Sequence, residues 1–374
     1  MIPFNKPYLV QPDQFSEELS LLRGFSGDKK FTRLCSELLE KKFSVPKVLL
    51  TPSCTDSLEL AAIALDIGPG DEVIMPSFTF VSTANAFVLR GANVVFIDIN
   101  PRTLNMDENL IEAAITKNTK AIVPVHYAGV ACEMDKINEL ANRYGLKVVE
   151  DAAQAILSTY KDKPLGTLSN YGCFSFHETK NIHCGEGGAI FVNNTELIER
   201  SEIIREKGTN RSKFFRGQVD KYTWVDVGSS FLLSDLNAWY LYPQLLGLES
   251  IIADRMKSWN IYKDQLKGLE QRELIELSVI PEHCKHNAHL FSLKLKNLKQ
   301  RDQLNHHLNQ NGVNSAFHYV PLHSSPAGKK FGRFHGQDNF TTDSSERLLR
   351  LPLYFGLKED EILKVVQTIE SFFR

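Results

Sequence analysis

One lysine near the middle of the chain has the surroundings that an amine nucleophile needs. Lys180 follows a short apolar run that ends at Phe176, and it precedes a glycine-rich turn at residues 185–188. This placement predicts a buried side chain, and burial favours the neutral form of an amine because it disfavours the charged form. A neutral lysine can form a Schiff base with a carbonyl compound. The alternative is a surface lysine after a strand, which is the commoner setting for this residue type.

An aspartate lies 29 residues before Lys180, at the end of an apolar run. Asp151 closes the predicted strand at residues 147–150, and the carboxyl ends of such strands face the ligand-binding edge of α/β sheets. Beside a Schiff-base lysine, this carboxylate could keep the ring nitrogen of pyridoxal phosphate protonated, which makes the ring an electron sink. Gln154 could contact the same ligand from one side. The alternative for Asp151 is an ordinary helix cap.

Residues 51–57 join a predicted strand to the start of a helix and include Ser53, Cys54 and Thr55. Free backbone N–H groups and the helix dipole at such a junction can bind a phosphate, helped by small hydroxyl side chains. The same run is also typical of a plain N-cap, and Asp56 would have to point away from a phosphate. Ser175 adds a hydroxyl five residues before Lys180. Phe80 could stack on a flat ring or lie in the core.

Strand-like and helical patterns alternate through the first two-thirds of the chain. We predict strands at residues 47–50, 72–75, 94–99, 121–125, 147–150 and 189–192, and helices at 55–66, 197–207 and 233–246. This alternation predicts a mostly parallel α/β sheet with helices on both faces. Later, a helix at 254–266, strands at 289–295 and 317–320, and a terminal helix from Glu359 predict a smaller α+β domain.

At 374 residues the chain exceeds what one hydrophobic core usually supports. We therefore predict a large domain at residues 1–248, whose N-terminal arm packs on a small domain at 249–374. Residues 208–228 are polar, basic and aromatic without periodicity, and a loop of this length is usually functional or at an interface. In the small domain, His318, Tyr319 and His323 form a second polar-aromatic cluster.

Composition excludes several classes of protein. Hydrophobic residues make up 43% and charged residues 24%, and the net charge of −2 gives no reason to expect nucleic acid or an anionic membrane as partner. The first residues lack the apolar stretch of a signal peptide, and no run approaches membrane-spanning length. The six cysteines have no paired spacing, so we expect neither a metal site nor disulfides. A cytoplasmic protein with reduced thiols is the expectation.

The order of these features along the chain is more informative than any one of them. A phosphate cradle, a stacking aromatic residue, Asp-x-x-Gln and Ser-x-x-x-x-Lys follow one another, and this set resembles the sugar-nucleotide aminotransferases among the fold-type-I pyridoxal phosphate enzymes. The resemblance covers nearly the whole chain. The matching runs are residues 48–55, 124–129, 150–154, 174–181, 205–211 and 214–224.

The resemblance implies a role for each matching residue. Lys180 would carry the Schiff base to the cofactor and shuttle a proton, and Asp151 would pair with the ring nitrogen. Phe80 and Gln154 would flank the ring. The remaining cofactor contacts, to the phosphate, would come from Ser175 and from the backbone of Cys54 and Thr55.

The resemblance also implies a homodimer whose active sites are shared between subunits, with the loop at 208–230 reaching into the partner's site. Arg211, Lys221 and Tyr222 of that loop, together with His323, would bind the nucleotide sugar. Many relatives carry Gly-x-Asn-x-Arg at residues 228–232, where this chain has Gly-Ser-Ser-Phe-Leu. Ser230 stands at the asparagine position, and its hydroxyl could keep the contact to the partner's cofactor phosphate.

The implied reaction moves the amino group of L-glutamate to C4 of a dTDP-4-keto-6-deoxyhexose, which yields a galacto-configured amino sugar and 2-oxoglutarate. Such sugars serve surface-polysaccharide synthesis. A gluco-configured product and a 3-ketosugar substrate are close alternatives. A lyase or aldolase with the same cofactor, and a non-catalytic sensor with this fold, are more distant ones.

Overall fold

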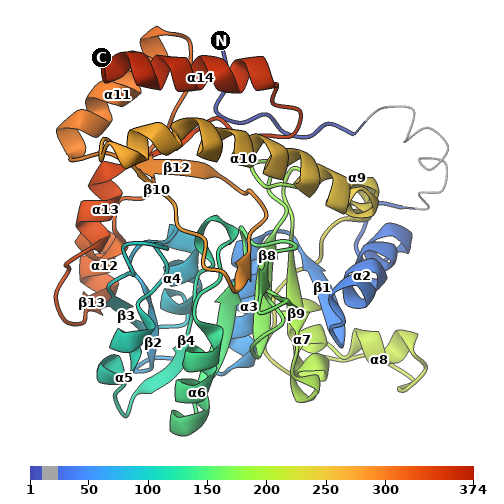
Figure 1. Cartoon of the computed structure of the whole chain (residues 1–374). Helices are drawn as coiled ribbons and strands as arrows, with labels where there is room; N and C mark the ends of the chain where they lie inside the picture. The colour runs from blue at the N-terminus through green and yellow to red at the C-terminus, as the bar shows by residue number, and fades with distance from the viewer. Residues whose placement is uncertain (11–23) are drawn as a thin grey trace.

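The computed structural model describes residues 1–10 and 24–374, and within them eight strands form a central sheet in the order β1-β9-β8-β5-β4-β2-β3-β13 (Figure 1). Strand β9 runs antiparallel to β1 and β8, and the other neighbours pair in parallel. The prediction of a mostly parallel sheet is therefore confirmed. The strands are β1 (Lys47–Thr51), β2 (Glu72–Pro76), β3 (Asn93–Ile97), β4 (Thr119–Ile122), β5 (Lys147–Asp151), β8 (Tyr171–Ser175), β9 (Gly188–Val192) and β13 (Gly332–Phe334).

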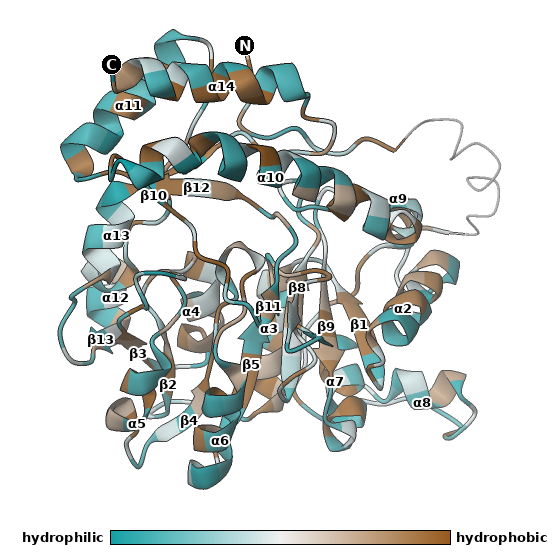
Figure 2. Ribbon diagram, viewed as in Figure 1, coloured by the Kyte–Doolittle hydropathy of each residue, from teal (hydrophilic) through white to brown (hydrophobic). Residues whose placement is uncertain are grey.

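Helices pack on both faces of this sheet because its strands are apolar on both sides. In β1, Val48 and Leu50 join the core on one face, whereas Leu49 joins the core on the other. Figure 2 shows hydrophobic residues along the central strands and hydrophilic ones on outward-facing parts of the helices. The first core includes α2 (Lys30–Phe43), α5 (Ile111–Ala114), α6 (Met134–Tyr144) and α9 (Asp235–Leu246); the second includes α3 (Cys54–Ala64), α4 (Val81–Val88) and α7 (Ile198–Arg205).

The C-terminal third forms an α+β unit with its own core. Within the described residues its antiparallel sheet has the order β10-β12-β14. Tyr262, Leu293 and Val365, from a helix, a strand and a second helix, are buried in one core. The N-terminal arm lies on this unit, because Ile2 bridges to Val313 and belongs to the same core. The exact domain boundary at residue 248 stays a prediction. The elements are α10 (Leu248–Gln271), β10 (Glu276–Leu277), β12 (Phe291–Lys294), α11 (Leu298–Gln310), α12 (Pro326–Phe331), α13 (Thr341–Arg347), β14 (Leu348–Leu351) and α14 (Glu359–Phe372).

One predicted strand is wrong. Residues 317–320 form no strand, and the nearest bridge in the described chain joins Ala316 to Arg350. All four residues of 317–320 line a cavity, so this segment serves the cavity instead of extending the sheet. The predicted loop at 208–228 also contains a short helix, α8 (Arg211–Phe215). The remaining short strands are β6 (Thr159–Tyr160), β7 (Lys163–Pro164) and β11 (Cys284–Lys285).

Over the part of the chain that the structure describes, no helix combines the length and apolar character that crossing a membrane requires.

Candidate active site

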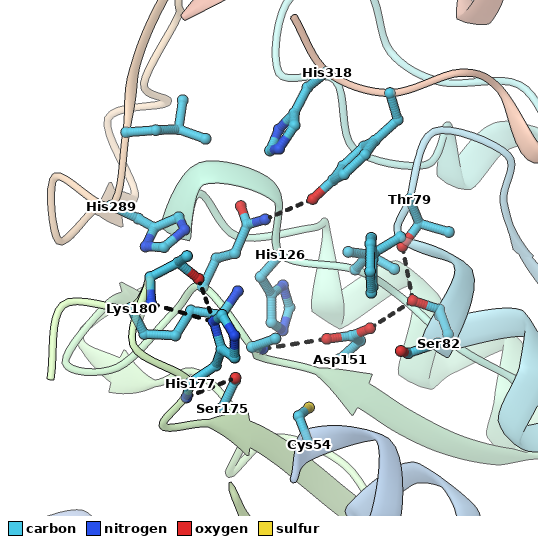
Figure 3. A pocket seen from close by; sticks show the side chains of 18 of the residues that line it. Cys54, Thr79, Ser82, His126, Asp151, Ser175, His177, Lys180, His289 and His318 are labelled. Carbon is cyan, nitrogen blue, oxygen red and sulfur yellow. Dashed lines mark hydrogen bonds between the residues drawn. The ribbon is translucent and has the colours of Figure 1, made fainter. Parts of the chain in front are cut away.

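A cavity of about 680 Å³ lies between the central sheet and the α+β unit. Its walls come from the ends of β5 and β8, the starts of α3 and α4, and three segments of the α+β unit at 289–290, 317–320 and 350–353. Lys180 and Asp151 both face it (Figure 3). The ends of parallel strands, where α/β proteins bind ligands, therefore form its floor.

Asp151 is the last residue of β5 and is held in a fixed orientation. Its Oδ2 accepts a 2.7 Å hydrogen bond from Thr83 Oγ1, and its Oδ1 accepts one of 3.2 Å from the Ala153 N–H. Thr83 is hydrogen-bonded in turn to Thr79, at 2.8 Å. Burial raises the pKa of Asp151 above its usual value, and the bond from Thr83 opposes this shift. A cationic partner at this carboxylate would replace the solvation that burial removes.

Lys180 lies in the turn after β8, with its backbone N–H donating to His177 O at 2.9 Å. Burial lowers the pKa of the Lys180 amine below its usual value. The charge of Arg350 lowers the pKa further, whereas Cys54 and Asp151 oppose the shift. The neutral, nucleophilic amine is therefore more populated than in an exposed lysine, as Schiff-base formation requires.

The start of α3 forms an anion cradle. The first backbone hydrogen bond of this turn runs from the Ser57 N–H to Ser53 O, at 3.2 Å, which leaves the N–H groups of Cys54 and Thr55 without a partner inside the helix. Asp56 does not line the cavity, and its carboxylate accepts a 2.9 Å hydrogen bond from Ser53 Oγ. The cradle combines free N–H groups with the positive end of the helix dipole.

Strand β9 approaches this cradle so closely that it needs a glycine. A Cβ added to Gly188 would lie 2.4 Å from the carbonyl carbon of Ser53 and 2.5 Å from the nitrogen of Cys54. The hydroxyls of Ser175 and Thr55 line the same part of the cavity, and Thr55 Oγ1 donates to Ser82 Oγ at 2.8 Å. An amine, a buried carboxylate and an anion cradle thus share one cavity, and this donor set fits the aldehyde, the ring nitrogen and the phosphate of pyridoxal phosphate.

Gln154 and Phe80 also line the cavity. Gln154 accepts a 2.7 Å hydrogen bond from the Ala128 N–H and donates to the Tyr319 hydroxyl at 3.1 Å, so its side chain is fixed. Phe80 is 57% exposed at the rim, with its ring centroid 6.3 Å from that of Tyr319. The exposure shows that Phe80 is not a core residue of the described chain.

Two histidines near the site differ in their surroundings. His126 is buried at the cavity wall, with Nε2 at 2.9 Å from Glu150 Oε2 and Nδ1 accepting from the Cys132 N–H at 3.2 Å. His183 lies outside the cavity lining and bonds to Tyr8 O at 2.7 Å. His183 therefore connects the N-terminal arm to the turn between β8 and β9.

Five predicted site residues lie outside the lining of this cavity in the single chain. Arg211 forms a 3.2 Å ion pair with Glu206, and His323 bonds to Ser77 Oγ at 2.7 Å. The other three are exposed, and their roles stay predictions. The five are Arg211, Lys221, Tyr222, Ser230 and His323.

The structure adds residues that sequence reasoning missed. Thr83 fixes Asp151, while Phe4, His289 and Arg350 line the cavity from distant parts of the chain. No local pattern marks these residues as part of the site. The one weak signal is for Thr83, whose hydroxyl lies on the first turn of α4, close in sequence to the predicted site residue Phe80. Burial lowers the pKa of His289 well below its usual value. His289 is therefore neutral at physiological pH.

The fold and site together define a class, that of the pyridoxal phosphate-dependent aminotransferases. A model of the DegT/DnrJ/EryC1/StrS aminotransferase family matches residues 26–370. The chain is 34% identical over 322 residues to a protein of Geobacillus stearothermophilus described as a pleiotropic regulatory protein, covering 86% of this chain and 83% of that one.

Solved structures agree with this match. A proposed sugar aminotransferase of Streptococcus pneumoniae in its PMP form superposes with a TM-score of 0.90 at 26% identity, covering 100% of this chain and 99% of that one. Its PLP form gives a TM-score of 0.89 at 26% identity, covering 99% and 98%. DesV of S. venezuelae gives 0.88 at 30% identity, covering 100% and 99%.

The chain belongs to the DegT/DnrJ/EryC1/StrS aminotransferase family. It is a pyridoxal phosphate-dependent sugar aminotransferase with the fold-type-I architecture, so the predictions of fold, enzyme class and cofactor are confirmed.

Proposed function

We propose that this chain transfers the amino group of L-glutamate to C4 of a dTDP-4-keto-6-deoxyhexose, producing dTDP-4-amino-4,6-dideoxygalactose and 2-oxoglutarate. This is the reaction of the enterobacterial transaminase that the matching sequence runs resemble, and it would serve lipopolysaccharide and common-antigen synthesis in the cytoplasm. The observation that carries the chemistry is the convergence of Lys180, Asp151 and the start of α3 on one cavity. The choice of this sugar and this nucleotide rests on the resemblance of the matching sequence runs to that transaminase.

The cofactor supplies an electron sink for the electrons released at the reacting carbon. In our proposal Lys180 Nζ removes the α-proton of glutamate and later delivers a proton to C4 of the sugar. Asp151 holds the proton on the ring nitrogen, and Thr83 keeps the carboxylate directed for that contact through its 2.7 Å bond. The backbone of Cys54 and Thr55, with Ser175, would bind the phosphate.

The rest of the proposed substrate site requires a second subunit. We infer a homodimer in which residues 208–230 cover the partner's cavity, bringing Arg211, Lys221 and Tyr222 to the nucleotide diphosphate and Ser230 to the cofactor phosphate. Exposed apolar side chains support this inference, since Trp224 is 78% and Phe215 68% exposed in the single chain. His323 is proposed as a further substrate contact.

A gluco-configured product and a 3-ketosugar substrate are the nearest alternatives, because the face of the sugar presented to the cofactor sets the configuration. A non-catalytic sensor is less well supported. Such a protein would not need the neutral Lys180 amine and the buried Asp151 carboxylate together.

The test is glutamate-dependent amination of dTDP-4-keto-6-deoxyglucose by the purified enzyme, with the product's C4 configuration assigned by NMR. We expect the axial, galacto-configured amine. An equatorial amine would identify the gluco alternative. If no product forms from this substrate but glutamate still bleaches the cofactor absorbance, the proposed sugar substrate is rejected. The aminotransferase chemistry is then retained.

A further inference from the structure

A short segment of the α+β unit is hydrogen-bonded to two loops of the central sheet beside the cavity. Residues 287–289, which we call the bridging segment, lie between β11 and β12. Asn287 and Ala288 are buried. Because buried hydrogen bonds are costly to break, the contacts of this segment fix the two loops relative to the α+β unit.

Asn287 holds the loop after β5 through both protons of its side-chain amide. Nδ2 donates to Gln154 O and to Ile156 O, each at 2.9 Å. Oδ1 accepts from the His289 N–H at 3.1 Å. Both donor positions of the amide and one acceptor position are therefore used. The backbone that carries Gln154 is thus held from the α+β unit, in addition to the two hydrogen bonds of the Gln154 side chain.

The bridging segment also holds the turn that contains Lys180. The next residue, Asn181, is buried, and its Nδ2 donates to Asn287 O at 2.9 Å. Its Oδ1 lies 2.9 Å from His289 Nδ1. An amide oxygen can only accept, so the His289 ring donates this bond from Nδ1. The same three residues that hold the Gln154 loop therefore hold the neighbour of Lys180.

The side chain of Asn287 occupies space that depends on a glycine in the sheet domain. A Cβ added to Gly129 would lie 2.3 Å from Asn287 Oδ1, and Gly129 has a φ of +77°. The residue before it, Ala128, donates its N–H to Gln154 Oε1 at 2.7 Å. The turn at residues 127–129 and the bridging segment therefore hold Gln154 from two directions, and the close approach requires the glycine.

The bridging segment has a backbone conformation that is unfavourable for its sequence. Ala288 has a φ of 49°, in the left-handed region that residues with a Cβ seldom adopt. Arg255, which is buried on α10, donates from Nε to Ala288 O at 3.0 Å and from Nη2 to His289 O at 2.7 Å. Such strain persists where surrounding contacts fix the conformation, and it clusters at functional sites. The strained residue lies between the two that contact Asn181.

The relative position of the two loops matters for the chemistry. Lys180 is on one loop and Gln154 on the other, and the cofactor ring must fit between their side chains. A misplacement of about 1 Å caused by a distant change can lower a rate about 100-fold. Asn181 and Asn287 lie outside the cavity lining of the described chain, so both act through their neighbours.

We propose that Asn287 is a positioning residue for the transamination. It sets the separation between the Lys180 turn and the Gln154 loop, and so aligns the amine with the cofactor ring. Asn181 is the second contact in this alignment. The inference rests on the proposed function, in which Lys180 forms the covalent link and Gln154 flanks the ring.

Asn287→Ala tests this alignment. It removes both bonds to the Gln154 loop and changes no residue of the cavity lining. Pyridoxal phosphate-loaded enzyme is mixed with L-glutamate without sugar, and the loss of cofactor absorbance gives a rate constant and a half-saturating concentration. We expect the rate constant to fall about 100-fold and the half-saturating concentration to stay within about threefold of wild type.

Two measurements without turnover accompany the kinetics. Titration of the Asn287→Ala apoenzyme with pyridoxal phosphate should show an affinity about tenfold weaker, since the ring loses one well-placed contact with Gln154. Thermal unfolding of the apoenzyme measures how far the lost bonds destabilise the fold. Rates and affinities are measured well below the unfolding temperature of each variant, so that folded proteins are compared.

Thr341→Val is the matched control. Thr341 of α13 is also buried, and its Oγ1 donates to Asp98 Oδ1 at 2.6 Å, which joins the α+β unit to the end of β3. Its replacement should lower the unfolding temperature, because a buried bond is lost. The rate constant and the cofactor affinity should stay within about twofold of wild type, because both residues lie outside the cavity lining.

Asn181→Ala breaks the alignment from the other side. It removes the bonds to Asn287 O and His289 Nδ1 and keeps those to the Gln154 loop, so we expect the same loss of rate constant with little change in half-saturating glutamate. The double variant should be within about threefold of either single variant, since both changes disrupt one shared alignment. If Asn287→Ala does not fold, Asn181→Ala is the test.

Three outcomes would overturn the proposal. A lower unfolding temperature with a normal rate constant and normal cofactor affinity would mean that Asn287 only stabilises the fold. A raised half-saturating glutamate concentration with a normal rate constant would assign it to donor binding. Losses that multiply in the double variant would mean that Asn181 and Asn287 act independently. Because no sugar is used, rejection of the proposed sugar substrate would leave the expected results unchanged, and Lys180→Ala tests the proposed link separately.

Discussion

The Lys180 cavity and the segment at residues 208–230 differ in how completely one chain builds them. In the cavity, Asp151, Gln154 and His126 are buried and each side chain is held by hydrogen bonds of 3.2 Å or less. In the segment, Tyr222 is 52% and Trp224 78% exposed. The residues proposed for cofactor chemistry are positioned within the single chain, whereas the residues predicted to bind substrate are not.

The difference separates the part of the site that one chain builds from the part proposed to need a partner subunit. Side chains positioned by buried hydrogen bonds keep their geometry without a ligand or a second subunit, because breaking a buried bond is costly. Exposed aromatic side chains lack such restraint and gain a fixed position when another surface covers them. Changes in the cavity should therefore act on chemistry, and changes in the segment on substrate affinity.

The largest effect should come from Lys180→Ala. Without the amine, neither the covalent link nor the proton transfer remains, and we expect turnover to fall by about 10⁴-fold, the upper range for a positioned proton carrier. The Schiff-base absorbance should disappear, as measured by spectroscopy before and after borohydride treatment. A borohydride-reducible link that persists in the variant would show that another lysine carries the cofactor.

Asp151→Asn should have the next largest effect. The amide keeps the shape and the contact with Thr83 but cannot stabilise a proton on the ring nitrogen, so we expect turnover to fall by about 10²- to 10³-fold. The cofactor should still bind, as shown by its absorbance after gel filtration. Turnover near the wild-type value would remove Asp151 from the mechanism and weaken the contrast between cavity and segment.

Gly188→Ala tests the anion cradle. The added Cβ would lie 2.4 Å from the backbone of Ser53, and the resulting displacement of the cradle should weaken pyridoxal phosphate binding by about 10- to 100-fold, given the usual 1–3 kcal/mol for overpacking. Equilibrium titration of the apoenzyme measures this. Gly68→Ala is the matched control, because nothing lies within 4 Å of its added Cβ. Equal affinities in the two variants would show that the cradle does not hold the phosphate.

The smallest effect should come from the segment. Replacing Lys221 and Tyr222 together by alanine should raise the KM for the nucleotide sugar by about tenfold, since two contacts at an exposed interface are lost, and should leave cofactor affinity unchanged. Steady-state kinetics and cofactor titration separate the two quantities. Mixing this variant with Lys180→Ala should restore some high-affinity turnover if subunits share sites. Unrestored turnover in verified mixed dimers would mean that each chain builds its own substrate site.

Much of the cofactor site could be predicted because its signals are local. Ser53 caps α3 just after β1, Asp151 ends β5, and Lys180 follows β8, so each residue is positioned by the element beside it in the sequence. The strand predicted at 317–320 failed for the opposite reason. Its aromatic and β-branched residues are typical of a strand, but all four residues line the cavity.

By itself the sequence indicated most of the alternation of strands and helices, which follows from short-range patterns of burial and polarity. Its ordered motifs, through their resemblance to the sugar-nucleotide aminotransferases, pointed to Lys180 and Asp151 as the lysine and the carboxylate of one site. Only the tertiary structure decided that Phe4 and Arg350 meet at this cavity, although 346 residues separate them in the chain. The physical reason is that the packing of the α+β unit against the sheet creates these contacts. No neighbour in sequence specifies them, and neither residue carries a local sign that it faces Lys180.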